Sequence, residues 1–136
     1  MVTDMTVHDV GSYIAEDRSW YIGEHGVNVD INVPLDFTTF IGANFADGLV
    51  KSGCVLGKIT ATGKYGPYDP AATDGRNTAA CHLHSSFKVP ANTATVASAA
   101  GVVHANVKVP RLPYASGAGA LDAAVRTALR NVHYID

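Results

Sequence analysis

Charged residues are scarce in this chain. Lysine, arginine, aspartate and glutamate together make up 16% of its 136 residues, below the roughly 25% that is usual for soluble domains. The formal net charge is −2, so the chain lacks the basic excess that neutralises nucleic-acid phosphates. We therefore expect no nucleic-acid partner, and we expect other proteins to cover part of this weakly charged surface.

Long apolar runs and cysteines are also few. The first residues, MVTDMTVHDVGSY, show no basic stretch followed by an apolar one, and no uncharged apolar run is long enough to span a bilayer. We expect a protein that is neither exported nor bound to a membrane. Cys54 and Cys81 lack the CxxC spacing, which favours two buried thiols in a reducing cytoplasm over the alternative of a single disulfide.

Motifs that would indicate catalysis are missing too. Residues 57–64, GKITATGK, superficially resemble a phosphate-binding loop. However, one residue too many separates Gly57 from Gly63, and Tyr65 replaces the Ser or Thr that should follow the lysine. No Gly-x-Ser-x-Gly motif and no locally activated cysteine is present. We therefore assign no catalytic residue, no cofactor-binding residue and no cofactor.

Histidine offers one candidate metal site. On a strand, His82 and His84 would share a face, and two imidazoles can bind a metal ion if a third ligand converges on them. Cys81 would point to the opposite face, and no other ligand has a spacing that forces it close. We interpret the pair as plain surface histidines and assign no metal ligand. The other histidines are expected to be hydrogen-bonded side chains: His8, His25, His104 and His133.

A clear alternation of apolar and polar residues predicts a strand over residues 27–33, VNVDINV. Its four branched apolar side chains fall on one face, while Asn28, Asp30 and Asn32 fall on the other. We expect the apolar face to meet a core and the polar face to meet solvent or a partner. Pro34 ends the strand.

Further strands are expected at residues 20–22, 55–62, 83–89, 102–109 and 132–135, and a polar connection at 91–100. A turn-rich segment follows the first alternating strand and carries Phe37, Phe40, Ile41 and Phe45, which we interpret as core residues rather than an exposed patch.

The C-terminal part predicts one helix. Leu121, Val125 and Leu129 recur at helical spacing, and Asp122 precedes Arg126 by one helical turn, an order that the helix dipole favours. Asn131 is a plausible left-handed stop, after which the final strand begins. Together with the strands, this helix predicts a mainly β (α+β) fold.

The most informative stretch is residues 53–80, GCVLGKITATGKYGPYDPAATDGRNTAA. The pattern Gly-x-Val-Leu-Gly-Lys-Ile-Thr-x-Thr-Gly-Lys-Tyr-x-Pro-Tyr-Asp-Pro over residues 53–70, followed by Asp-Gly and an Ala pair over 74–80, resembles the lambda-type head decoration proteins of tailed bacteriophages. The resemblance extends over residues 47–83, with support from 99–112 and 119–136. The chain departs from it after the Ala pair, where the family commonly has Gly-Ile-Leu in place of Cys-His-Leu.

The resemblance implies a structural virion protein without catalytic activity. Such proteins bind the outside of an icosahedral capsid, usually as homotrimers at three-fold positions, and cement neighbouring capsomers, which stabilises the mature head. The implied partners are the major capsid protein and further copies of the chain. The implied location is the exterior of the virion capsid, after synthesis in the host cytoplasm.

The fold that the resemblance suggests is a β-clip, a sharply bent ribbon, here with one C-terminal helix and an extended N-terminal arm. We expect the arm over residues 1–19 and a single β-rich decoration domain over residues 20–136.

Two segments are candidate contacts with partners. The arm is weakly patterned and is expected to order on a capsid by adding a strand to a sheet edge. Its candidate residues are Thr3, Asp4, Met5, Thr6, Val7, His8, Asp9 and Val10.

The second candidate is a rigid turn that offers apolar area at low entropic cost, unless its residues only brace the turn. Its residues are Lys64, Tyr65, Pro67, Tyr68 and Pro70.

Two other functions stay open at this stage. One is a capsid-attached module that binds host-surface glycans, for which Asn28, Asp30 and Asn32 offer polar contacts. The other is a small β-rich metal protein or enzyme of unrelated origin.

Overall fold

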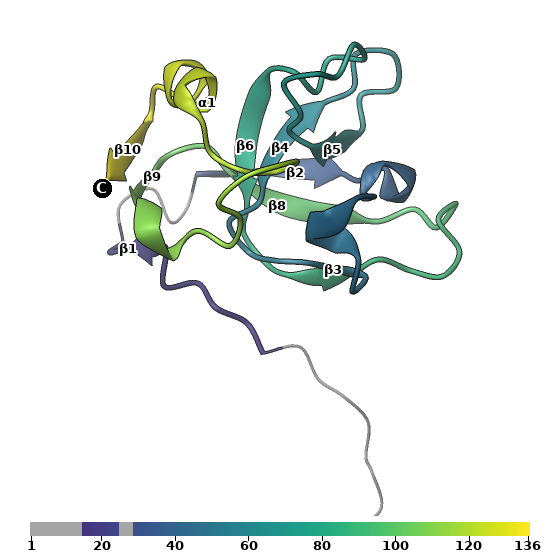
Figure 1. The fold of residues 1–136 in the computed structure, drawn as a ribbon, viewed down its shortest axis with the longest axis horizontal. Coiled ribbons are helices and arrows are strands. Elements are labelled where there is room, and N and C mark those ends of the chain that lie inside the picture. Colours follow the sequence, from purple (N-terminus) through teal and green to yellow (C-terminus); the bar gives the residue numbers. More distant parts are fainter. Residues whose placement is uncertain (1–14, 25–28) are drawn as a thin grey trace, which may run out of the picture.

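The structure is a computed structural model that describes residues 15–24 and 29–136. Within these ranges the protein is mainly β, with ten strands in several sheets and one α-helix near the C-terminus (Figure 1), which confirms the predicted fold class. The candidate arm residues 3–10 lie outside the described residues, as do His25, Val27 and Asn28.

The main sheet has five strands in the order β2-β8-β6-β4-β5, and each neighbouring pair is antiparallel. Its strands are β2 (Asp30–Pro34), β4 (Val55–Lys58), β5 (Tyr65–Pro67), β6 (Ala79–Leu83) and β8 (Ser98–Val102). A separate pair joins β3 (Leu49–Val50) to β7 (Phe87–Lys88).

A three-stranded sheet lies at the other end of the molecule, beside the helix (Figure 1). Its central strand β9 (Ala105–Lys108) pairs antiparallel with β1 (Tyr21–Ile22) and parallel with β10 (Val132–Ile135). The final strand therefore has the predicted bounds. The described part of the chain also forms three short 3-10 helices: η1 (Phe37–Thr39), η2 (Ala43–Phe45) and η3 (Val109–Arg111).

The helix α1 spans Ala123–Ala128. Asp122 is its N-cap and accepts a hydrogen bond from the Val125 backbone N–H at 2.9 Å, while Arg126 pairs with Asp136 instead of with Asp122. The predicted left-handed stop at Asn131 is wrong, because no described residue other than glycine has a positive φ. The helix ends before Asn131, at the C-cap Leu129, where the backbone leaves the helical region.

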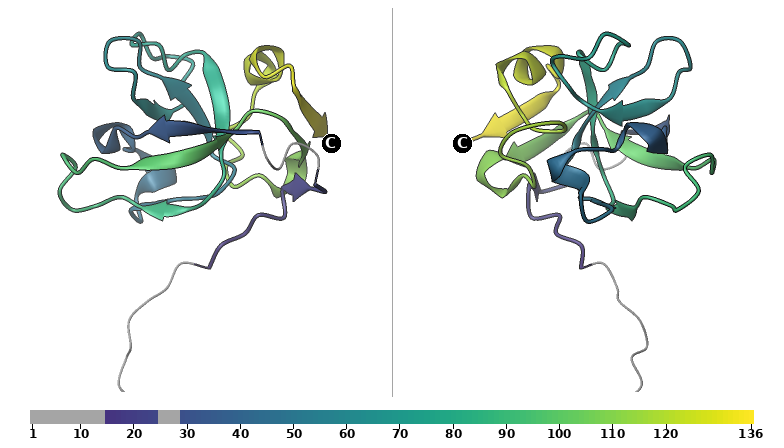
Figure 2. Two further views of the ribbon diagram at one scale, coloured as in Figure 1. Left: turned by 180° about the vertical axis from the view of Figure 1, so that it is seen from behind. Right: turned by 45° about the vertical axis from the view of Figure 1, so that its right-hand side comes forward.

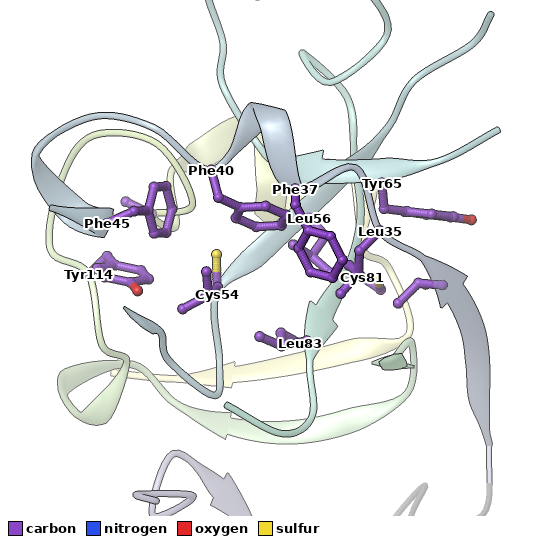
Figure 3. Packing of buried hydrophobic residues seen from close by; sticks show 13 residues of the cluster. Leu35, Phe37, Phe40, Phe45, Cys54, Leu56, Tyr65, Cys81, Leu83 and Tyr114 are labelled. Carbon is purple, nitrogen blue, oxygen red and sulfur yellow. The ribbon is translucent and has the colours of Figure 1, made fainter. Parts of the chain in front are cut away.

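Two hydrophobic clusters divide the interior, and β4 and β6 contribute to both. The first cluster contains the three phenylalanines of the η1–η2 segment (Figure 3), which confirms them as core residues, whereas Ile41 between them is 73% exposed. Cys54 and Cys81 are free, buried thiols of this cluster, as predicted. Burial raises the pKa of the Cys81 thiol to about 12, so it is protonated at neutral pH.

The second cluster packs α1 against the main sheet and the three-stranded sheet. Trp20 is fully buried at its centre and donates its Nε1–H to the Ser52 hydroxyl at 3.0 Å. Val125 and Leu129 supply the buried face of the helix region. This placement confirms the helical spacing read from the sequence, although Leu121 is only half-buried.

The structure corrects the alternating strand predicted over residues 27–33. Strand β2 begins at Asp30, and only Val33 of the apolar face is fully buried. Val29 and Ile31 are 50% and 37% exposed, because this end strand of the sheet extends beyond the first cluster. Alternation predicted the direction of the side chains but not how far the core reaches.

The predicted strands at 83–89 and 102–109 are each broken in two. Strand β6 ends at Leu83 and β7 begins at Phe87. The residues between them form hydrogen bonds with Ser52 instead of continuing the strand. The Ser52 N–H donates to the Ser86 hydroxyl, and the Ser52 hydroxyl donates to the His84 carbonyl. A break after Val102 carries the chain from the main sheet into the three-stranded sheet. The strand β8 also begins inside the predicted polar connection.

Candidate functional site

His82 lies fully buried at the junction of the two sheets, so the prediction of a surface histidine is wrong. Its Nδ1 is 2.8 Å from the Gly53 carbonyl oxygen, which only accepts hydrogen bonds. Nδ1 therefore carries the proton, and Nε2 accepts the Tyr134 hydroxyl at 2.7 Å. The imidazole also stacks on Trp20, with 5.5 Å between ring centroids.

The environment of His82 keeps it neutral. Burial lowers its pKa to about 4, and the hydrogen bond to Gly53 opposes this only partly. His84 lies outside β6, with its Nδ1 3.6 Å from Asp30 Oδ2. Among residues 15–24 and 29–136, no three His, Cys, Asp or Glu side chains converge as metal ligands, and both nitrogens of His82 are already bonded.

The phosphate-loop-like segment forms the turn between β4 and β5. The Gly63 N–H donates to the Ile59 carbonyl at 2.9 Å, and the Ile59 N–H donates to the Lys64 carbonyl at 2.7 Å. The turn itself therefore uses two backbone N–H groups that a phosphate would need. Lys58 and Lys64 are exposed at its rim.

The candidate contact turn places most of its residues inside the molecule. Tyr65, Pro67 and Tyr68 are buried, while Lys64 and Pro70 are exposed. The Tyr68 hydroxyl donates to Asp122 Oδ2 at 2.9 Å, which braces the turn against the N-terminus of α1. Burial raises the pKa of Tyr68 to about 12, so this hydroxyl stays a donor. In the single chain, only two of the five side chains are presented to a partner.

Two of the polar residues considered for glycan contact, Asp30 and Asn32, lie in β2. Asp30 is turned toward His84, and its Oδ1 is buried without a hydrogen-bond partner. Asn32 is exposed, and the third residue of the set lies outside the described residues.

Four large apolar side chains are exposed on the described surface: Val29, Ile31, Ile41 and Val96. The sequence predicts none of them as contact residues, because its patterns place the first three in the core and Val96 in a polar connection. For Val96, which is 82% exposed, the usable signal was one branched apolar residue within a run of alanines and threonines.

The last residues of the predicted arm are bound to the body. Glu16 Oε1 accepts the Ser86 backbone N–H at 2.6 Å, and Arg18 donates to the Ser85 hydroxyl at 2.8 Å. Figure 2 shows this segment leaving β1 beneath the sheets. The chain therefore enters its first strand along the segment that joins β6 to β7.

Comparison with known proteins gives one family. The family model of bacteriophage lambda head decoration protein D matches residues 41–134, more than half of the chain. This range contains the strands β3 to β9, the helix and all of β10 except Ile135, but not β1 or β2. No curated protein matches the chain.

Proposed function

The chain belongs to the bacteriophage lambda head decoration protein D family, and we propose that it binds the outer capsid surface as a homotrimer and cements neighbouring capsomers. The family assigns it a structural role in the phage capsid. We further propose that the protein lies on the exterior of the capsid, binds the major capsid protein and forms a three-fold oligomer. We also propose that it stabilises the mature head and is made in the host cytoplasm.

The family match over residues 41–134 carries this proposal. The proposal is also supported by the reactive side chains of the core, which are buried or bonded to other residues of the same chain. His82 and Tyr134 form a hydrogen bond with each other, Tyr68 forms one with Asp122, and burial raises the pKa of both thiols, so they are protonated. These groups hold the described core together, as expected for a protein that acts by adhesion.

Repeated weak contacts explain how such a small protein stabilises a shell. When one subunit of a trimer has bound, the remaining contacts become intramolecular and gain from a high effective concentration. If the protein binds only the mature lattice, it stabilises that state by mass action. The gain is about 2.7 kcal/mol per site at a free concentration one hundred times the dissociation constant.

We propose that contact residues come from three places. The arm residues 3–10 add a strand to a capsid sheet edge through main-chain hydrogen bonds. Lys64 and Pro70 are the exposed members of the candidate turn. Ile41 and Val96 add exposed apolar side chains that a partner would cover.

Cryo-electron microscopy of particles with and without the protein tests this function. We expect added density on the outer surface at three-fold positions, with the α1 end and the β3–β7 end distinguishable by docking the fold. Density inside the shell, or no added density at saturating protein, would contradict the proposal. A parallel glycan screen of decorated particles tests the alternative, in which binding to sugars would rise with the amount of bound protein.

A further inference from the structure

Two strands of the described structure face each other across a groove without pairing. Strand β7 pairs with β3 on one side, and β8 pairs with β2 on one side. On its other side, β8 pairs with β6 only at Gly101 and Val102. Within the described residues, therefore, the side of Ser98–Ala100 that faces β7 has no strand partner.

The groove between these strands has a volume of about 510 Å³, and apolar residues supply much of its lining: Leu35, Phe37, Phe87, Pro90, Ala97 and Ala99. One end is closed where the His84 N–H donates to the Ala100 carbonyl at 3.0 Å. An apolar groove bounded by two strand edges suits an extended peptide segment, which gains main-chain hydrogen bonds and side-chain burial together.

The chain itself approaches one end of this groove. Arg18 bonds to Ser85 and Glu16 bonds to Ser86, and both serines line the groove. These two side-chain contacts follow each other in antiparallel order, because the sequence number falls along the arm as it rises along the partner segment. Continued in the same direction, the next arm residues would lie beside Phe87 and Lys88, in the geometry of an added antiparallel strand.

We propose that the groove between β7 and β8 binds the chain's own N-terminal segment, residues 10–14, as an added strand antiparallel to β7. The segment reads VGSYI and supplies Val10, Tyr13 and Ile14 as apolar side chains. Attachment at Glu16 favours the chain's own segment over a separate peptide, because the tether raises its effective concentration.

This inference does not rest on the capsid role. In a decoration protein, it provides a place that holds the base of the arm before the shell is bound. If the segment docks but the protein does not bind capsids, only the proposed function fails. If the protein binds capsids but the segment does not dock, only this inference fails.

Cysteine cross-linking of the full chain tests the docking. Ser12→Cys is combined with Ser98→Cys in the groove, and the matched control combines Ser12→Cys with Asn77→Cys, an exposed position in the β5–β6 connection. The native thiols Cys54 and Cys81 are buried and should not compete. Under mild copper-phenanthroline oxidation, we expect at least tenfold more intrachain disulfide from the groove pair than from the control. Equal yields, or only interchain disulfides, would overturn the proposal.

Hydrogen exchange gives a second, independent readout without cysteines. Deletion of residues 2–14 should speed exchange of the Lys88 and Ser98 backbone amides at least tenfold and leave the amides of β4 unchanged. If the deletion leaves all these rates unchanged, the groove does not bind this segment. If the β4 amides accelerate equally, the deletion has destabilised the whole fold, and docking is not supported.

Discussion

The hydroxyl of Tyr134 donates to Nε2 of His82 across 2.7 Å and thereby joins the three-stranded sheet to the main sheet. The imidazole is fully buried, and its other nitrogen is held by the Gly53 carbonyl. Tyr134, His82 and Gly53 therefore form a series of hydrogen bonds in the interior. Loss of either partner would leave a nitrogen of His82 buried without a hydrogen bond.

Tyr134→Phe removes that partner while keeping the ring. We expect a loss of about 1–3 kcal/mol in the free energy of unfolding, because Nε2 of His82 is left buried without a donor. Urea unfolding measures the change. His133→Ala, at an exposed position of the same strand, is the control and should change stability much less. Equal effects of the two variants would show that the hydrogen bond does not contribute.

The free energy of unfolding should fall as the pH drops below 6.5. The pKa of His82 is about 4 in the folded protein and about 6.5 in the unfolded chain, so the unfolded state binds the proton first. The contribution of His82 to the free energy of unfolding is fully present at pH values above its pKa in the unfolded chain. It is lost progressively as the pH falls toward its pKa in the folded protein. Between pH 7 and pH 5 the loss from this group is about 2 kcal/mol.

His82→Gln separates this effect from that of other groups, because glutamine keeps hydrogen-bonding capacity and does not titrate in this range. Urea titrations at several pH values should show a flatter dependence between pH 7 and pH 5 for the variant. A slope equal to that of the wild type would contradict the assignment of the effect to His82.

The interior position of His82 could not be read from the sequence, and the reason is physical. Alternation indicated that His82 and Cys81 point to opposite faces, and the two clusters confirm that separation. It could not indicate that both faces of β6 are buried, because that depends on β10, which pairs in a different sheet far along the chain. Strands covered on both sides lose the polar face that alternation relies on.

Gly101→Ala should destabilise the main sheet. A Cβ at this position would lie 2.7 Å from Cys81 Sγ and 2.9 Å from Val33 Cγ1, so the core must shift. We expect a cost of about 1–3 kcal/mol, as is usual for overpacking, measured by urea unfolding. Adding Cys81→Ala should recover part of the loss, since it removes the sulfur, and strict additivity in this double-mutant cycle would contradict the contact.

Leu129→Asp should strongly destabilise the protein. Leu129 is 6% exposed in the second cluster, and a buried carboxylate without a partner is costly. We expect a loss of more than about 3 kcal/mol in unfolding free energy. Ala124→Asp, at an exposed position of α1 near its N-terminus, is the matched control and should leave stability nearly unchanged. Full thermal stability of Leu129→Asp would show that the buried face is assigned wrongly.

The exposed apolar residues give a prediction about partners. Ile41→Asp and Val96→Asp alter side chains that are 73% and 82% exposed, so unfolding free energy should change by less than about 0.5 kcal/mol. Co-sedimentation with capsids should weaken at least threefold if these residues lie in the interface. Asn77→Asp, also exposed, serves as the control. Unchanged binding by both apolar variants would remove them from the proposed contact surface.

The sequence predicted local elements better than it predicted contact surfaces. The terminal strand, the helical spacing around Val125 and the buried thiols follow from patterns within a few residues, and the structure confirms them. The burial of Tyr68 does not follow from such a pattern, because it depends on Asp122 at the start of a distant helix. Aromatic residues in a proline-rich turn can either contact a partner or support the turn from within the chain. Only the contact between Tyr68 and Asp122 shows which of these applies to Tyr68.

Resistance of purified shells to heat tests the central claim most directly. Capsids that lack a decoration protein are incubated with the wild-type chain or with the destabilised Leu129→Asp variant, and shell rupture is followed by light scattering during heating. The account predicts that the wild-type chain raises the rupture temperature in a saturable manner and that the variant does so less. Saturating wild-type protein that leaves the rupture temperature unchanged would contradict it.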